Sequence, residues 1–393
     1  MQGLRTAWKE AAWVFGLSRL IILIVTYITV SVLPQAGQAA PPGCARGFKS
    51  CLLAWYHWDA AAYVRIAHQG YSLPSDVAFF PLWPLIEHFG GLLLGGSFPF
   101  AYYIAGLLLS NIFFYFALVL LYSLLSEDFE PTVARRALFY FAFSPYALFF
   151  FAGYTESLFV LLCVAIFLLL RRGKALDWWL AGFLGFLAAL TRSSGIVLAI
   201  PFFVVYIQRF WTPEERPQHS WLQKVNAFLP ILLIPAGIAV YLLYLGYTKG
   251  SPLILSHQEA TVWNRHFDFI WNTYFTAFRG FFTHPIFSWT AQENFLDISF
   301  TLIPLAALIL GWKLIPLHYR LFALALALFS LSFPLAIAEP LNSQPRYLMV
   351  IFPIAVILAI WGKRQRFDQC FNVVSLPLLA VNIILFVSHY RVA

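Results

Sequence analysis

The stretch from Pro99 to Leu124 decides the fold and reads PFAYYIAGLLLSNIFFYFALVLLYSL. It contains no charged residue, and a helix needs about 20 consecutive apolar residues to cross a bilayer. Comparable apolar runs recur along the whole 393-residue chain, which is 61% hydrophobic and only 11% charged. A soluble domain carries about 25% charged residues. The sequence therefore predicts an all-α polytopic membrane protein formed as one transmembrane domain over residues 1–393.

About eleven apolar runs are long enough or nearly long enough to span the membrane. They cover residues 12–34, 99–124, 137–152, 155–170, 178–192, 194–210, 226–247, 296–312, 319–338, 346–362 and 370–389. Basic residues occupy alternate connections, such as Arg135 and Arg136 or Arg171 and Arg172. Because cytoplasmic loops are enriched in Lys and Arg, this pattern predicts the N-terminus inside and the C-terminus outside.

Two longer connections, about 35–98 and about 247–293, fall on the outer side in this topology. Both are too polar to span the membrane, yet both are rich in Trp, Phe and Tyr. Such composition is typical of amphipathic helices at a membrane interface, or of a lid over a cavity. Cys44 and Cys51 lie in the first connection, where either a disulfide or two free thiols would be compatible with the sequence.

Composition and motifs argue against several functions. The net charge of +8 comes mainly from short loops, where Lys and Arg set topology, and so does not indicate nucleic-acid binding. The sequence has no Walker loop, GxGxxG or HExxH motif and no Cys/His cluster. We therefore expect no bound cofactor and no metal site built from such a cluster, while metal dependence stays open.

Asp59 is the leading candidate for a catalytic residue. If the segment around it is helical, Asp59 shares a face with Trp55, Tyr63 and Ile66. A carboxylate on such an apolar, aromatic face is costly to desolvate unless it is paired or used, and a desolvated carboxylate is a stronger base. The alternative is local capping or pairing, although Arg65 is about 120° away around a helix.

Other polar residues gather where apolar runs meet the predicted outer face. Tyr154 and Glu156 begin one run, and Glu156 could either bind substrate or interact with a helix dipole. Arg192 lies in an outer turn, and Arg346 follows Gln344 at the start of a later run. Each arginine could extend toward the interface or bind a lipid phosphate, because guanidinium binds phosphate oxygens bidentately.

The second outer connection offers further polar candidates without diagnostic spacing. They are His257, Gln258, Glu259, Arg265, His266 and Asp268. We expect most of them to be solvated loop residues, and we include His257 among the substrate-binding candidates.

An ordered set of these motifs resembles the PIG-V family of mannosyltransferases (glycosyltransferase family 76), which has GPI mannosyltransferases among its eukaryotic members. The matching segments are His57-Trp58-Asp59-Ala60 with Tyr63, Phe79-Phe80-Pro81-Leu82, Tyr154-Thr155-Glu156-Ser157, Thr191-Arg192-Ser193 and Pro345-Arg346-Tyr347. The resemblance covers about residues 10–360. It implies a GT-C fold and a polyprenyl- or dolichyl-phosphate-mannose donor, with Asp59 as catalytic base. Asp76 is a weaker candidate for a second acid.

These observations predict an inverting mannosyl (hexosyl) transferase of the non-cytoplasmic membrane face. Arg346 and Arg192 would bind the donor phosphate, and His57, Trp58, Tyr63, Tyr154, Glu156, Gln344, Tyr347 and His257 would contact substrates. The chain lacks large loop insertions, which suggests a bacterial cytoplasmic-membrane enzyme with a glycolipid or glycan acceptor; in a eukaryote the site would face the ER lumen. The rival interpretations are a lipid or glycan transporter (flippase) and a non-catalytic assembly subunit.

Overall fold

The computed structural model describes residues 2–33, 52–212 and 218–392, and these residues are almost entirely helical. Within these ranges the structure contains no β-strand, only an isolated bridge between Arg265 and Leu335. The predicted all-α class is therefore confirmed. Cys44 and Cys51, and with them the question of a disulfide, lie outside the described residues.

Six helical runs in the described residues are long and apolar enough to cross a membrane. They are Gly3–Val32, Phe100–Asp128, Ser193–Phe210, Trp221–Lys249, Trp289–Leu310 and Gln365–Val387. Shorter apolar helices cover Ala175–Thr191, Leu317–Leu331 and Phe352–Trp361. Many large apolar side chains on these helices are exposed, for example Leu243 and Leu310, as expected for helices solvated by lipid. The protein is therefore an integral membrane protein.

Contacts between Cα atoms divide the chain into two compact units. Unit 1 comprises residues Met1–Ser72, Trp83–Leu161 and Leu358–Ala393, and unit 2 comprises Leu73–Leu82 and Leu162–Ile357. Each unit is therefore assembled from segments far apart in the sequence. The single domain expected from the sequence stays a prediction.

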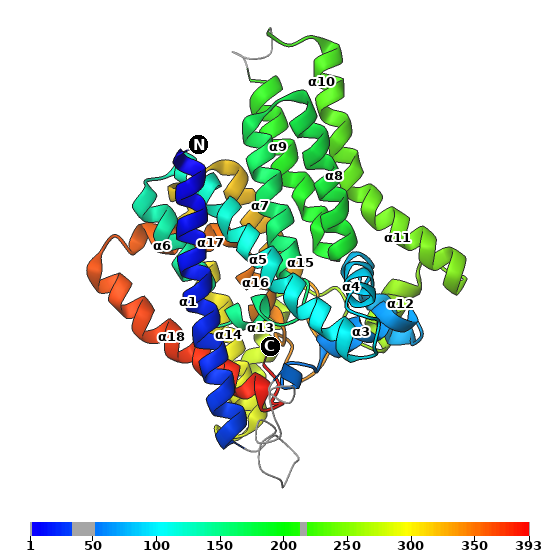
Figure 1. Cartoon of the computed structure of the whole chain (residues 1–393), viewed down its shortest axis with the longest axis vertical. Helices are drawn as coiled ribbons and strands as arrows, with labels where there is room; N and C mark the ends of the chain where they lie inside the picture. Colours follow the sequence, from blue (N-terminus) through cyan, green and yellow to red (C-terminus); the bar gives the residue numbers. More distant parts are fainter. Residues whose placement is uncertain (1, 34–51, 213–217, 393) are drawn as a thin grey trace. The chain divides into compact units, whose positions relative to one another are not determined.

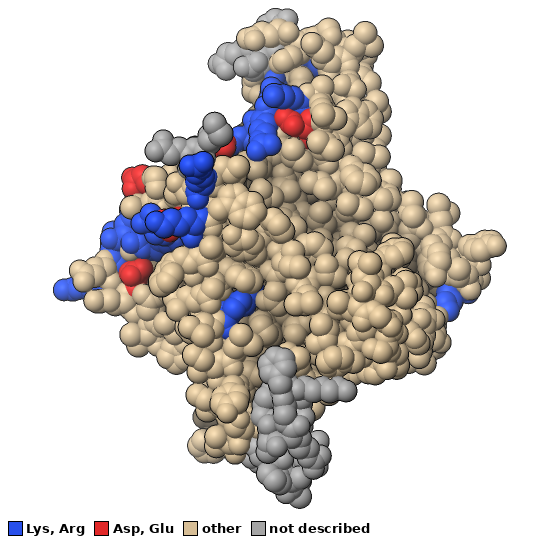
Figure 2. All heavy atoms as spheres, in the orientation of Figure 1, with Lys and Arg blue, Asp and Glu red and all other residues tan. Residues whose placement is uncertain are grey.

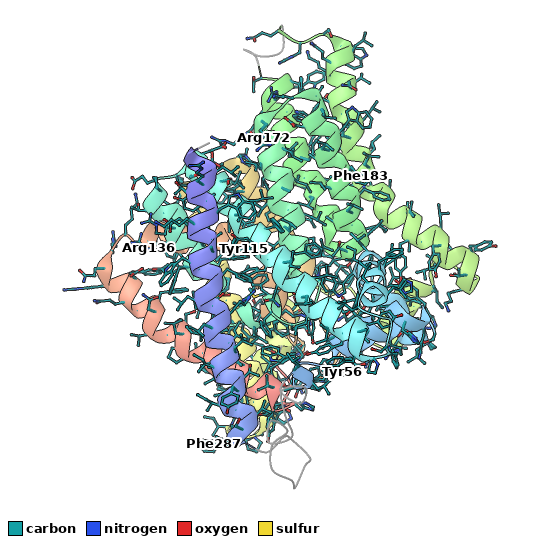
Figure 3. All side chains as sticks on the ribbon, viewed as in Figure 1. Tyr56, Tyr115, Arg136, Arg172, Phe183 and Phe287 are labelled. Atoms are coloured by element: carbon teal, nitrogen blue, oxygen red, sulfur yellow. The ribbon has the colours of Figure 1, made fainter. Side chains whose placement is uncertain are left out.

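Unit 1 is built around the long helices α1 (Gln2–Val32) and α5 (Phe100–Asp128), labelled in Figure 1. Its other elements are α3 (Asp59–Gln69), α4 (Leu82–Leu93), α6 (Pro131–Ala142), η3 (Ala147–Phe150), the start of α7 (Glu156–Arg172) and α18 (Gln365–Val387). Helix α1 packs against α5, α6 and α18. The ring of Tyr115, on α5, lies 5.6 Å from that of Trp8, on α1 (Figure 3).

Three segments that the charge pattern predicts on one side of the membrane meet in unit 1. The contacts are ion pairs joining Arg135 to Glu10 (2.8 Å), Arg136 to Asp368 (3.1 Å) and Lys363 to Glu130 (2.9 Å). They connect α1, the α5–α6 turn and the α17–α18 turn. This arrangement agrees with a common side for these segments, while their cytoplasmic location stays a prediction.

Unit 2 contains the remaining helices. They are η2 (Pro74–Ala78), α8 (Ala175–Thr191), η4 (Ser193–Leu198), α9 (Ala199–Phe210), α10 (Trp221–Phe228), η6 (Leu229–Leu232), α11 (Leu233–Lys249), α12 (Ile254–Thr261), α13 (Ile270–Thr283), α14 (Trp289–Leu310), η7 (Trp312–Leu314), α15 (Leu317–Leu331), α16 (Gln344–Met349) and α17 (Phe352–Trp361). The visible surface over α8, α9 and α11 carries charged side chains mainly near helix ends (Figure 2).

Small residues allow α8 to pack closely against η6 and α11. A Cβ atom on Gly182 would lie 2.4 Å from the carbonyl oxygen of Pro230, and one on Gly237 would lie 2.5 Å from that of Phe186. Helices in membranes associate through such small residues, because burying apolar surface between helices contributes little free energy when the alternative environment is lipid. Glycine is therefore required at both positions by this packing.

We expect Gly182→Ala to destabilise the protein by about 1–3 kcal/mol, the usual cost of overpacking a close contact. Thermal unfolding in detergent would measure the loss as a lower midpoint. Gly16→Ala in α1 is the matched control, since no atom lies within 4 Å of the added Cβ. Equal midpoints for the two variants would contradict this account of the close contact between α8 and η6.

Both predicted outer connections contain short helices, as expected. The first holds α3 and α4, and the second holds α12 and α13. Helix α13 buries Thr273, Ala277 and Gly280 on one side, and Ala277 joins a core that includes Ile298 of α14. Trp271 and Phe275 remain exposed on α13. Such an apolar exposed face suits a membrane interface, and that placement stays a prediction.

Candidate functional site

Asp59 is the first residue of α3, and a strained residue precedes it. Trp58 has φ 54° and ψ −130°, although 48% of its surface is exposed. A bulky residue rarely adopts positive φ, and such conformations cost about 1–3 kcal/mol and cluster at functional sites. The sharp turn at Trp58 therefore fixes where the chain enters α3 and where Asp59 is held.

The predicted aromatic face around Asp59 is only partly correct. Tyr63 and Ile66 lie on α3 with Asp59 and are buried, 7% and 4% exposed. Trp55 does not share this face, because the turn at Trp58 places it before the helix begins. The helical periodicity applied to Trp55 was wrong because a positive φ interrupts the helix. Trp55 is instead buried against the rings of Phe151 and Phe386.

An aromatic group centred on Phe386, near the end of α18, joins two motifs of unit 1. We call it the Phe386 group. The ring centroid of Phe386 lies 4.4 Å from His57, 5.2 Å from Trp55, 5.7 Å from Phe149 and 6.3 Å from Tyr154. The structure thus brings His57 and Tyr154 to one ring. The sequence analysis missed Phe386 because an apolar residue in a predicted span carries no distinguishing signal.

His57 is held in its neutral form. Burial and, to a smaller extent, the nearby His389 together lower the pKa of His57 to about 3. The His57 ring lies 4.5 Å from that of His389, a residue with φ 66° just beyond α18. A neutral imidazole within an aromatic group can pack against a sugar face or donate a hydrogen bond. With so low a pKa, His57 is a weak base and does not compete with Asp59 for the proton of an acceptor hydroxyl.

The remaining candidates of unit 1 are buried. Tyr154 is 1% exposed and packs edge-on against Phe149. Glu156 is fully buried at the start of α7, where a helix N-terminus favours a carboxylate. Asp76, the weaker candidate for a second acid, belongs to unit 2 and accepts a hydrogen bond from the backbone N–H of Leu73 at 2.8 Å. That bond gives Asp76 a local structural role.

Glu87 is a buried acid that the sequence analysis did not single out. It lies on α4, is 1% exposed, and its Oε2 atom has no hydrogen-bond partner among the described residues. Its carboxyl group packs against Gly106 of α5, where an added Cβ would come within 2.1 Å of Oε1. Burial raises the pKa of Glu87 well above its usual value. The pKa of Tyr56, labelled in Figure 3, is raised by burial and then by Glu87.

We expect Glu87→Gln to flatten the pH dependence of stability. The folded protein binds this proton more tightly than the unfolded chain, so stability falls as pH rises above 4.5 toward the raised pKa. One such proton contributes a slope of up to ~1.4 kcal/mol per pH unit. Unfolding midpoints from pH 4.5 to 8 would measure it, with the exposed Glu127→Gln as control. The same slope in Glu87→Gln and wild type would refute the assignment.

Three arginines of unit 2 surround the ring of Tyr347. The guanidinium carbons of Arg192, Arg346 and Arg265 lie 4.8, 4.9 and 5.6 Å from its centroid. Arg346 also donates from Nη2 to the Tyr347 hydroxyl at 3.1 Å. We call these three residues with Tyr347 the arginine cluster. Cations over aromatic faces are held in place by the ring's electrostatic field.

The cluster is assembled from three separate segments. Arg192 directly follows α8, Arg346 lies in α16, and Arg265 follows α12 in the second predicted outer connection. The predicted pair Arg192 and Arg346 is therefore brought together. Arg265 was noted in the sequence only as one of several loop residues, because its neighbours in sequence give no sign of this convergence.

Two other candidates differ in their relation to the cluster. Gln344 is fully buried, and its Nε2 donates to the carbonyl of Phe333 at 3.5 Å, the same carbonyl that accepts from Arg265. His257 is exposed on α12, and the hydrogen bonds described for it are made by its backbone. Gln344 therefore shares a hydrogen-bond acceptor with Arg265 of the arginine cluster. The hydrogen bonds described for His257 do not involve the cluster.

The described residues contain no group of three or more His, Cys, Asp or Glu side chains arranged to hold a metal ion.

Comparison with known proteins gives the family. The model of the family described as mannosyltransferase (PIG-V) matches residues 15–269. GPI mannosyltransferase 2 of Schizosaccharomyces pombe is 30% identical over 249 residues, which are 57% of this chain and 50% of that protein. Human GPI alpha-1,6-mannosyltransferase 2 is 31% identical over 193 residues, 46% of this chain and 38% of its own. The chain thus spans half or less of these relatives.

Among solved structures, the Archaeoglobus fulgidus oligosaccharyltransferase tethered to an acceptor peptide aligns with 97% of this chain and 55% of its own. The sequence identity is 13% and the TM-score 0.41. The family match covers most of the chain and includes Asp59, Tyr154, Glu156, Arg192 and Arg265. The chain belongs to the mannosyltransferase (PIG-V) family.

Proposed function

We propose that the protein is an inverting mannosyltransferase that moves mannose from a polyprenyl-phosphate-linked donor to a glycolipid or glycan acceptor. The match to the mannosyltransferase (PIG-V) family over residues 15–269 carries this proposal. The curated relatives are named GPI mannosyltransferases, which supports mannose as the sugar and a glycolipid as the acceptor.

Asp59 is the proposed general base. In the reaction, the acceptor oxygen forms a bond to the anomeric carbon of mannose while the bond from that carbon to the phosphate oxygen breaks. Asp59 takes the proton of the acceptor hydroxyl, and the electron pair of the broken bond stays on the lipid phosphate. The strained entry to α3 at Trp58 supports this role, because a fixed carboxylate loses little freedom on reaching the reactive geometry.

The arginine cluster is the proposed phosphate site. Guanidinium groups bind phosphate oxygens through two parallel N–H bonds, and Arg346 is already held by Tyr347. Donors positioned before the reaction stabilise the charge that develops on the leaving group. Gln344, tied to the carbonyl of Phe333, would support the same region.

Trp58 and the aromatic residues buried behind it in unit 1 are the proposed sugar-binding region. His57 and Tyr154 meet at Phe386, Trp58 is exposed beside Asp59, and Tyr63 lies on the same helix. Sugar faces pack well on such rings, and a dry surface protects a reactive donor from hydrolysis. Glu156 and His257 stay candidate substrate contacts.

The proposed location is a membrane with the reactive groups on its non-cytoplasmic face, the bacterial cytoplasmic membrane or, in a eukaryote, the ER with its lumenal face. The alternating basic turns support this orientation. No soluble cofactor is required, since the donor is itself a membrane lipid.

The direct test is transfer by the purified protein. It would be incubated in detergent with a polyprenyl-phosphate donor labelled on mannose and with extracted lipid acceptors. We expect labelled product together with one free lipid phosphate for each sugar transferred. Movement of labelled donor across a vesicle membrane without product would instead support a flippase. If neither transfer nor movement were detected, the protein would be a non-catalytic subunit.

A further inference from the structure

The arginine cluster faces a phosphate that would gain a terminal oxygen, and a negative charge, when mannose leaves it. A lipid-phosphate-mannose donor is a diester with two non-bridging oxygens. The cluster places three guanidinium groups, from Arg192, Arg346 and Arg265, within 5.6 Å of the Tyr347 ring centroid. Arg265 is the one of the three that the sequence analysis did not single out for phosphate binding.

The position of Arg265 is fixed by the fold. Its Nη1 donates to the carbonyl of Phe333 at 3.0 Å, and its backbone pairs with Leu335. On either side, Ala336 N–H donates to the carbonyl of Asn264 at 2.7 Å and Asp268 N–H donates to that of Ser332 at 3.0 Å. Residues 264–268 are thus joined to residues 332–336, which precede α16.

The pairing of residues 264–268 with 332–336 also determines which charged groups lie near Arg265. Asn264, with φ 51°, turns the chain immediately before Arg265. Glu259 lies nearby, and burial raises its pKa, a rise that the charge of Arg265 partly offsets. The carbonyl of Phe333 uses one of the five N–H donors of Arg265, so the guanidinium can be anchored and still present donors to a ligand.

We propose that Arg265 binds the third terminal oxygen of the lipid phosphate, the oxygen that exists as a free group only after mannose has left. This inference rests on the proposed function. When the bond from the anomeric carbon breaks, its electron pair stays on the former bridging oxygen, and the diester monoanion becomes a monoester carrying close to two charges. Arg192 and Arg346 hold the two oxygens that are free from the start.

The consequence is selective stabilisation of the leaving group. An interaction that strengthens as the bond breaks accelerates the reaction, whereas one made equally with the donor only tightens binding. Arg265 therefore acts on turnover and on affinity for the lipid phosphate product. It contributes little to affinity for the intact donor.

The test compares two soluble probes that differ only in the third oxygen. Farnesyl phosphate is the monoester, and methyl farnesyl phosphate is the diester. Their affinities for the full-length protein in detergent at pH 8 would be measured by calorimetry, for wild type and Arg265→Gln. Glutamine keeps a donor for the carbonyl of Phe333 and so preserves the loop.

We expect Arg265→Gln to weaken farnesyl phosphate binding about 10- to 100-fold, the usual effect of one charge-assisted hydrogen-bond partner. Affinity for methyl farnesyl phosphate should change by less than about 3-fold. Turnover should fall while the donor KM stays nearly constant. Arg279→Ala, an exposed arginine of α13 in the same connection, is the matched control and should behave as wild type.

Two results would overturn the inference in a protein that transfers mannose. Equal losses for monoester and diester would make Arg265 a ligand of the intact donor, and no loss for either would remove it from the phosphate site. Failure of the proposed function looks different, because wild type would then yield no mannosylated product whatever its preference between the probes.

Discussion

Replacing Asp59 with asparagine is expected to lower mannosyl transfer by about 10²–10⁴-fold, the contribution of a general base. Asparagine preserves the size of the side chain but cannot accept the acceptor proton. Initial rates with labelled lipid-linked mannose would measure the loss. Asp59→Glu should retain part of the activity, because the carboxylate is present but displaced along a longer side chain.

Asp128→Asn, at the end of α5, is the matched control and should keep the wild-type rate. Unfolding midpoints should be measured for all three variants, so that a loss of activity is not confused with a loss of folded protein. A folded Asp59→Asn variant with the wild-type rate would eliminate Asp59 as the base and leave Glu156 as the next acid of unit 1 to test.

Replacing Arg346 with alanine should lower turnover by about 10²–10³-fold, the effect of removing one donor from an anion-stabilising site. Arg346 is 6% exposed and donates to Tyr347, so its guanidinium is fixed before the reaction. Arg346→Lys should restore only a fraction of the rate. A lysine supplies charge without the planar pair of donors that matches phosphate.

The control for this series is Arg364→Ala, an exposed arginine beyond α17, which should leave turnover unchanged. Tyr347→Phe tests the positioning of Arg346 without removing its charge, because it removes the hydroxyl that accepts from Arg346 and keeps the ring. Its effect should be smaller than that of Arg346→Ala. If Arg346→Ala retained full turnover with an unchanged unfolding midpoint, the phosphate would have to be bound elsewhere.

The sequence indicated which polar residues are candidates for the site, but it did not indicate which residues lie next to them in the structure. Arg192 and Arg346 stood out because charged residues are rare beside apolar runs, and the structure brings both to Tyr347. Arg265 did not stand out, since several charged and polar residues share its loop and no periodicity separates them. Its position depends on the pairing of residues 264–268 with 332–336, which is a contact between distant segments.

Helical periodicity failed around Asp59 for a local reason. The interval from Trp55 to Asp59 fits a helix, but the backbone turns at Trp58 with φ 54°. Tryptophan carries no sequence signal for positive φ, unlike glycine or asparagine. The strain is maintained by surrounding packing, such as that of His57 and Trp55 on Phe386, and packing of this kind cannot be read from a short segment.

Glu87 illustrates the same limit for an acid. On α4 it resembles any charged residue of an amphipathic helix, and only its burial against Gly106 distinguishes it. Gly106 leaves space on α5 for the carboxyl group of Glu87 on α4. Neither segment alone predicts this contact, because it forms only when the two helices pack.

The sequence alone determined the membrane class and the all-α class and pointed to the candidate residues, because apolar length and the cost of charge in lipid are properties of single segments. Tertiary structure decided which candidates lie together. It placed Arg265 with Arg192 and Arg346, moved Trp55 away from Asp59 and buried Glu87. Such convergence depends on loop pairing and helix packing between residues far apart in the chain, and no local pattern encodes it.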